Sequence, residues 1–388
     1  MFKIHVPTEY YFGEGALEEL SRIPLPGKKA FVCTTSGKSV RRFGYLTKLE
    51  EALKAQGIES VIFDEIEPNP TKDTIMKAAS AAKSAGCDFV LGFGGGSPMD
   101  AAKVIALMAT NPGDLWDYCF KGSGGKQSPS VAPLPIVCVS TTAGTGSELD
   151  AGGVITNTDT NEKFGIGFPC LFPTVSVVDP LLTLTVPKDQ TIYQGMDTFY
   201  HLAEGYLSKA TNLMNEMYAL EGIAKTVENL PKCVADGTDR EARRLMSFAN
   251  SLGGLVMATG TLVSQHALEH VLSAHYPKLP HGAGLIMLAP AYFDCLIRKG
   301  ACPERFIRLA QVMGMKDATK PEDFLAAHQA LLEAVGAGEV CMSNYGIRRE
   351  ELNGFAKEVK ETAAMQFKND PVELTEADVA SIYEAAWR

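Results

Sequence analysis

The chain has 388 residues, more than one compact core usually holds, so we expect two domains. Its 46% hydrophobic and 21% charged residues are ordinary proportions for a globular enzyme in water. The formal net charge of −10 disfavours nucleic acid or an anionic membrane as the main partner.

The amino-terminal residues lack the basic-then-apolar order of a signal peptide, and no apolar run reaches the roughly 20 residues that span a bilayer. Nine cysteines are scattered without a Cys-x-x-Cys pair, which disfavours a disulfide framework and a thiolate zinc site. Several of them, including Cys33 and Cys138, lie in apolar runs and are expected to be buried, inert thiols. These features together predict a cytoplasmic protein.

The first half of the chain alternates short, continuously apolar runs with helical patterns at 46–55 and 71–85. Continuous hydrophobicity indicates strands covered on both faces, as in a parallel sheet. Alternating strands and helices predict a doubly wound, mostly parallel α/β domain. Strands are expected at residues 29–34, 60–64, 88–93, 135–140 and 175–178.

After the proline-bounded segment 179–187, the pattern becomes helical and strand signals nearly vanish. We therefore place an α/β domain at residues 1–185 and an all-helical domain at 186–388, with the active site in the cleft between them. Helices are expected at 203–208, 217–229, 240–251, 324–335 and 379–387.

A glycine-rich segment, residues 92–100, follows the predicted strand 88–93 and opens a helix at 99–108. Ser97 suits the N-cap and Pro98 the first helical position, so free N–H groups would face the glycines and bind an anion. The segment departs from the usual dinucleotide fingerprint because Ser97 replaces the third glycine, and a plain strand-to-helix turn explains it as well.

A second small and polar segment, residues 140–148, follows the predicted strand 135–140. Its hydroxyl groups and glycines could line a phosphate or nicotinamide pocket. Two such loops at the ends of strands in one sheet favour a dinucleotide ligand. We therefore expect the α/β domain to be the dinucleotide-binding one.

Five of the seven histidines lie between residues 201 and 281. Asp197 and His201 are spaced i,i+4 in a helical stretch, so both project from one face, and His266 and His270 repeat that spacing. His281 follows in a predicted turn. One carboxylate and two or three imidazoles suit Fe²⁺ or Zn²⁺, which makes the helical domain the metal-binding one.

Ordinary structural roles remain an alternative at these positions. An Asp–His pair at i,i+4 can be a surface ion pair, and a buried histidine can simply donate to a carbonyl oxygen. His5 and His328 lie far from the cluster along the chain, so structural or surface roles are expected for them.

With these residues identified, the chain resembles the iron-containing alcohol dehydrogenase family, with its dehydroquinate synthase-like fold, along nearly its whole length. The ordered combination of segments is far more specific than any one of them. The matching segments are residues 12–20, 94–103, 132–148, 165–187, 195–206 and 266–282.

The resemblance implies that Asp197, His201, His266 and His281 bind a catalytic divalent metal, usually iron and in some members zinc. His270 matches a family histidine near the substrate and nicotinamide, so it is our candidate for relaying the proton. The positions that resemble cofactor-binding ones are Gly95, Gly96, Ser97, Asp100, Thr141, Thr142, Thr145, Ser147, Lys163 and Leu182. Asp150 departs from the family pattern, where threonine is common.

The activity implied is that of a metal-dependent alcohol dehydrogenase or aldehyde reductase. It would transfer a hydride between NAD(P)(H) and a small primary alcohol, diol or aldehyde, as in fermentation, in a homodimer or larger homo-oligomer. The family places the loop at residues 35–42 beside the adenosine ribose. That loop contains Gly37 and Lys38 and no carboxylate, which favours NADP(H) over NAD(H). In the alternative interpretation, Lys38 and the arginines of this loop only form the solvated start of a helix, and the cofactor is NAD(H).

Three other functions are weighed against this one. A hydroxyacid–oxoacid transhydrogenase or related reductase would need an arginine clamp, which the sequence does not obviously place. Dehydroquinate synthase needs a dense basic pocket, yet few Lys or Arg residues lie near the metal motifs. A non-catalytic partner in an assembly would not need both glycine-containing loops and a complete ligand set. The sequence favours no single alcohol as the natural substrate.

Overall fold

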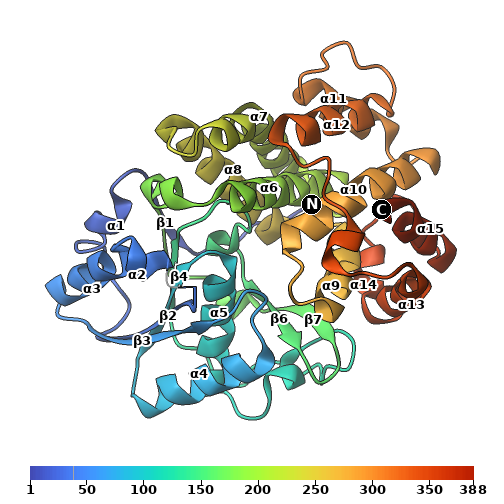
Figure 1. Ribbon diagram of the computed structural model, residues 1–388. Helices are drawn as coiled ribbons and strands as arrows, with labels where there is room; N and C mark the ends of the chain where they lie inside the picture. Colours follow the sequence, from blue (N-terminus) through green and yellow to red (C-terminus); the bar gives the residue numbers. More distant parts are fainter. Residues whose placement is uncertain (38) are drawn as a thin grey trace. The chain divides into compact units, whose positions relative to one another are not determined.

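The computed structural model describes residues 1–37 and 39–388, which form two compact units. One unit spans Ile4–Val186, and the other comprises Pro187–Arg388 with Met1–Lys3. Among the described residues, no helix combines the length and the apolar character needed to cross a membrane. Each unit is considered separately (Figure 1).

The first unit is built on a six-stranded sheet in the order β1-β8-β5-β4-β2-β3, and every neighbouring pair in it is parallel. The sheet confirms the predicted parallel α/β architecture. Its strands are β1 (Glu9–Phe12), β2 (Lys29–Thr35), β3 (Glu59–Ile66), β4 (Phe89–Gly94), β5 (Ile136–Ser140) and β8 (Val175–Val178).

Helices cover both faces of this sheet. Along β2, Phe31 and Cys33 contribute to the core under α4 (Lys72–Ser84) and α5 (Gly96–Thr110). The alternate residues Ala30 and Val32 contribute to the core under the helices of the other face. Those helices are α1 (Ala16–Glu19), α2 (Ser39–Arg42) and α3 (Tyr45–Ala55). Burial on both faces explains why the inner strands β4, β5 and β8 are mostly apolar at successive residues rather than at every second one.

Three strands escaped the sequence analysis. β1 has the sequence Glu-Tyr-Tyr-Phe and lies at the sheet edge, where polar atoms reach solvent. β6 (Gly152–Asn157) and β7 (Glu162–Gly167) form a separate antiparallel pair. Their glycines and charged residues interrupt the hydrophobic run that identifies a buried strand, so the pattern did not indicate them.

The second unit is helical, as predicted, and Pro187–Arg388, all of which the structure describes, contains no β-strand. The predicted helices were correctly placed but too short at one or both ends. The helices are α6 (Lys188–Leu207), α7 (Leu213–Ala235), α8 (Arg240–Thr259), α9 (Gln265–His275), α10 (His281–Arg298), α11 (Pro303–Val312), α12 (Asp323–Val335), α13 (Leu352–Thr362), α14 (Ala364–Phe367) and α15 (Glu376–Ala386).

Helix α6 is the central helix of this unit, and two of its glycines explain how closely its neighbours approach. A Cβ on Gly195 would come within 2.3 Å of the Leu230 side chain of α7. A Cβ on Gly205 would come within 2.1 Å of Val256 on α8. Close packing on two sides buries polar residues of α6 as well as apolar ones, and buried polar groups need partners.

All nine cysteines lie within the described residues and are free thiols. Six are buried, as expected from their apolar surroundings, whereas Cys170 is exposed. Burial raises the pKa of Cys138 to about 12, so this thiol stays protonated and unreactive near neutral pH.

Candidate active site

The polar face of α6 carries Asp197, His201 and Glu204, spaced four and three residues apart. This spacing stacks their side chains on one side of the helix. All three are at most 6% exposed. A buried face with two carboxylates and an imidazole is costly unless other charged groups or a cation meet it.

Two further helices bring imidazoles to this face. His266 lies in the first turn of α9, and its ring stacks on that of His201 with centroids 4.5 Å apart. His281 is the first residue of α10, where the sequence analysis expected a turn. The start of α10 packs closely on α6: a Cβ on Gly282 would lie only 2.2 Å from the Tyr193 carbonyl oxygen, so glycine is needed at this position.

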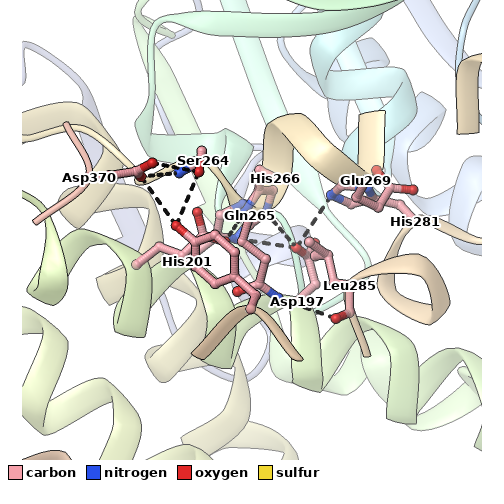
Figure 2. Close-up of polar contacts among 11 residues, drawn as sticks. Asp197, His201, Ser264, Gln265, His266, Glu269, His281, Leu285 and Asp370 are labelled. Carbon is pink, nitrogen blue, oxygen red and sulfur yellow. Dashed lines mark hydrogen bonds and ion pairs between the residues drawn. The ribbon is translucent and has the colours of Figure 1, made fainter. Parts of the chain in front are cut away.

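The carboxylate of Asp197 is the common neighbour of these imidazoles (Figure 2). Its Oδ1 atom lies 3.3 Å from Nε2 of His266, 3.6 Å from Nδ1 of His201 and 3.6 Å from Nε2 of His281. Donors held tetrahedrally at about 2.0–2.1 Å from one ion stand about 3.3–3.4 Å apart. Asp197, His201 and His266 each offer a donor atom within 4.8 Å of the others, whereas His281 is linked to this group through Asp197 and is grouped more closely with Glu269 and His270. The N/O donor chemistry suits a divalent cation such as Fe²⁺ or Zn²⁺.

The charges of this group are strongly coupled. Burial by itself would raise the pKa of Asp197, but His201, His281 and His266 outweigh it and lower the pKa to about 2. Burial would likewise lower the pKa of His266, but Glu204 and Asp197 raise it to about 10. The pocket thus favours positive charge at its centre, supplied by a proton or by a metal ion.

His270, one turn after His266 on α9, lies beside this group. It is buried, and its ring centroid is 5.4 Å from that of His281 and 6.3 Å from that of His266. A nitrogen of His270, a nitrogen of His281 and an oxygen of Glu269 lie within 4.8 Å of one another. His270 is therefore adjacent to the group of donors around Asp197.

The remaining histidines take part in other contacts. His275 lies near the surface, where its Nε2 is 2.9 Å from the carboxylate of Glu358. His328 is buried against the Tyr200 hydroxyl at 3.0 Å, and burial lowers its pKa to about 4. His5 is exposed.

In the α/β unit, the two predicted cofactor loops pack directly on each other. A Cβ on Gly95 would stand 3.1 Å from the Thr142 hydroxyl, and one on Gly96 would stand 2.4 Å from Cγ2 of Thr145. The loops follow β4 and β5, which are neighbours in the sheet. Glycine is needed here because the threonines of one loop occupy the space beside the other.

The start of α5 differs from the prediction. Ser97 was expected to cap the helix, but α5 begins at Gly96 with Gly95 as its N-cap and no side chain capping it. Pro98 is therefore the third helical residue, where its missing N–H costs nothing. Because no side chain caps α5, its first N–H groups stay available for an anion.

A lysine missed by the sequence analysis holds the second loop in place. Lys103 is fully buried and donates to Ser147 Oγ at 2.8 Å, Asp150 Oδ1 at 2.7 Å and the Gly152 carbonyl at 2.8 Å. Ser147 in turn donates to Asp100 at 2.5 Å. Asp150, which departs from the family pattern, thus pairs with a buried cation. In the sequence, a lysine among the alanines and valines of a helix expected to be buried could have identified Lys103 as a residue with a buried partner.

The other predicted cofactor residues are more dispersed. Thr141 is joined to β4 by its N–H, which donates to the Gly94 carbonyl at 2.8 Å. Lys163 is buried in β7, and the Leu182 side chain lies in a hydrophobic core, which leaves its backbone for any ligand contact. Lys38 lies outside the described residues.

The strand order locates a ligand site independently. β2 is followed in sequence by β3 on one side, whereas β4 lies on its other side, so the connections diverge between β2 and β4. Open α/β sheets bind ligands at the carboxyl ends of strands at such a point. The loop after β2, which contains Gly37, and the loop at Gly95 both lie there. In α2, just after the former loop, Arg41 donates to Asp64 of β3 at 2.8 and 3.0 Å.

Models of protein families match both parts of the chain. The model of the iron-containing alcohol dehydrogenases matches residues 7–180, and the model of the carboxyl-terminal part of the Fe-containing alcohol dehydrogenase family matches residues 191–387. The chain belongs to the iron-containing alcohol dehydrogenase family.

Relatives match over most of their length. A protein of Bacillus subtilis (strain 168), described as a probable NADH-dependent butanol dehydrogenase, is 33% identical over 98% of both chains. The 1,3-propanediol dehydrogenase of Klebsiella pneumoniae is 36% identical over 81% of this chain and 80% of its own. Among solved structures, an archaeal halo-thermophilic alcohol dehydrogenase from a Red Sea brine pool has a TM-score of 0.94 at 28% identity, covering 100% and 99% of the two chains.

Proposed function

We propose that this member of the family is a nicotinamide-dependent alcohol dehydrogenase and aldehyde reductase that requires a divalent metal ion. The observation that carries the proposal is the meeting of three imidazoles around the Asp197 carboxylate at 3.3–3.6 Å. The relatives named for butanol and 1,3-propanediol support small primary alcohols, diols and their aldehydes as substrates.

Asp197, His201, His266 and His281 would hold the metal. The bound ion, iron by family or zinc by the same donor chemistry, supplies Lewis acidity that lowers the pKa of an alcohol and polarises an aldehyde carbonyl. With one carboxylate and three neutral imidazoles as its ligands, a dipositive ion would keep part of its charge uncompensated by the ligands themselves. Burial of Asp197, His201 and His266 keeps bulk water from weakening the field of that charge, whereas the His281 side chain is 23% exposed.

His270 would carry the proton between substrate and solvent, because its ring lies beside the proposed ligands and an imidazole can both accept and donate a proton. The glycine and threonine loops after β4 and β5 would hold the pyrophosphate of the cofactor, with the uncapped start of α5 facing it.

The choice between the two nicotinamide cofactors rests on the loop at residues 35–42. The sequence favoured NADP(H) because the loop lacks a carboxylate, but the Asp64 carboxylate of β3 lies beside it and engages Arg41. The named butanol dehydrogenase relative is NADH-dependent. We therefore propose NAD(H) as the preferred cofactor, and kcat/KM measured with NADH and NADPH tests it.

The decisive experiment measures metal content and aldehyde-dependent NAD(P)H oxidation with C2–C4 aldehydes and diols in one preparation. His281→Ala should lose both the metal and turnover, whereas His270→Ala should keep the metal, react more slowly and change its pH profile. Full activity in a metal-free His281→Ala variant would refute the metal assignment. Hydride exchange between hydroxy- and oxo-acids without added cofactor would instead indicate a transhydrogenase.

A further inference from the structure

Two buried glutamates lie directly behind the proposed metal ligands. Glu204 Oε1 is 2.5 Å from Nδ1 of His266, and Glu269 Oε2 is hydrogen-bonded to Nδ1 of His281. Both glutamates are 0% exposed. Neither is among the proposed metal ligands, and the sequence analysis singled out neither of them.

The two contacts repeat one pattern. His201-x-x-Glu204 on α6 and His266-x-x-Glu269 on α9 each place a carboxylate one turn after a histidine. In each case the carboxylate serves the histidine of the next helix rather than its own. Glu204 of α6 contacts His266 of α9, and Glu269 of α9 contacts His281 of α10. The glutamates thus link the three helices that carry the proposed ligands.

The atoms involved determine which ring nitrogen is available to a metal. When the carboxylate accepts a hydrogen bond from Nδ1–H, the neutral ring must present Nε2 as its lone-pair donor. In both rings that Nε2 faces Asp197, at 3.3 Å for His266 and 3.6 Å for His281. A carboxylate on the far nitrogen also increases the basicity of the donating nitrogen.

We propose that Glu204 and Glu269 are positioning residues that fix the tautomer and ring orientation of His266 and His281 for the metal. This inference rests on the proposed function, since it assumes that Asp197 and the three histidines hold the ion. Two fully buried carboxylates are costly to keep in an apolar helical unit. A purely structural role could be filled by neutral residues, whereas orientation of a cation's ligands uses the charge.

The arrangement at His270 offers a competing role for Glu269. Its carboxylate, His270 and His281 lie within 4.8 Å of one another and could hold a second ion. The direct contact between Glu269 Oε2 and Nδ1 of His281 argues against this, because it already uses one carboxylate oxygen and one ring nitrogen of the three residues. The number of metal ions bound per chain distinguishes the two roles.

The test uses the full-length protein, stripped of metal and titrated with Co²⁺ alone. The variants are Glu204→Gln and Glu269→Gln, which keep the shape of the side chain but remove its charge. Glu358→Gln is the matched control, because Glu358 makes the same kind of contact with His275 of α9, near the surface. Circular dichroism of each metal-free variant verifies that it is folded, and alanine variants at 204 and 269 extend the series.

We expect one Co²⁺ per wild-type chain, with visible absorption bands of a site having nitrogen and oxygen ligands. Each glutamine variant should raise the dissociation constant about 10–100-fold and shift those bands, with a larger rise for alanine, while Glu358→Gln leaves both unchanged. Wild-type affinity and spectrum in both folded variants would overturn the proposal. Two ions per wild-type chain would overturn it for Glu269. A wild-type chain that binds no metal would refute the proposed function itself.

Discussion

The packing of the two loops in the α/β unit gives a prediction that can be worked out atom by atom. In Gly96→Ala the new Cβ would lie 2.4 Å from Cγ2 of Thr145, 2.9 Å from its Oγ1 and 3.1 Å from its Cβ. Ordinary carbon contacts stand about 3.5–4.0 Å apart. Rotation of Thr145 does not relieve the clash, because its Cβ is also too close and its Oγ1 accepts from the Ser147 N–H at 3.3 Å.

Overpacking of this kind costs about 1–3 kcal/mol, and the helix preference of alanine offsets little of it because Gly96 is the first residue of α5. We expect a net loss of about 1–2 kcal/mol, which lowers the unfolding temperature by roughly 2–8 °C for a unit of this size. The displaced loops should also raise KM for the cofactor more than they lower kcat. Differential scanning calorimetry and cofactor titration measure the two effects.

The controls come from the same chain. Gly96→Ala with Thr145→Ser removes the atom at 2.4 Å and should recover part of both losses. Gly354→Ala adds a Cβ in open space on α13, so it should stabilise the protein by up to about 1 kcal/mol. The reasoning fails if Gly96→Ala matches the wild type in stability and cofactor KM, or if the serine replacement recovers nothing.

Three more predictions concern buried charge and the metal. Lys103→Met should lower the free energy of unfolding by about 3–5 kcal/mol in urea denaturation, because Asp150 loses its buried partner; a loss below about 1 kcal/mol would contradict this. Burial raises the pKa of Asp370 to about 7, so the wild type should lose stability, on the order of 4 kcal/mol, as pH rises from about 4 to 7. Asp370→Asn should abolish this dependence of unfolding free energy on pH. An equal pH dependence in the wild type and the variant would show that other groups cause it. Removing the metal by chelation should lower the unfolding temperature. The loss of stability should be about 4 kcal/mol if the free ion was present at about 1,000 times its dissociation constant. An unchanged unfolding temperature in protein verified to be metal-free would show that the ion does not stabilise the fold.

The residue pattern predicted those features that depend on neighbours along the chain. Continuous apolar runs identified β2, β4, β5 and β8, because strands covered on both faces need apolar residues at successive positions, and a short apolar run at 61–63 also identified the edge strand β3. Helical spacing placed Asp197 and His201 on one face, since a turn of helix fixes that geometry locally. The pattern could not reveal β1, β6 and β7, whose polar and glycine residues are tolerated at an edge or in a separate pair.

Contacts between distant segments were decided only by the tertiary structure. Asp197 and His266 are 69 positions apart, and their 3.3 Å separation depends on how α6 and α9 pack. The same holds for Lys103, whose charge is tolerated in a buried helix because Asp150 and the carbonyl of Gly152 meet it from another segment. Local spacing sets which side chains share a face, whereas packing sets what that face meets. The ionic pairs behind the histidines therefore became visible only in the folded chain.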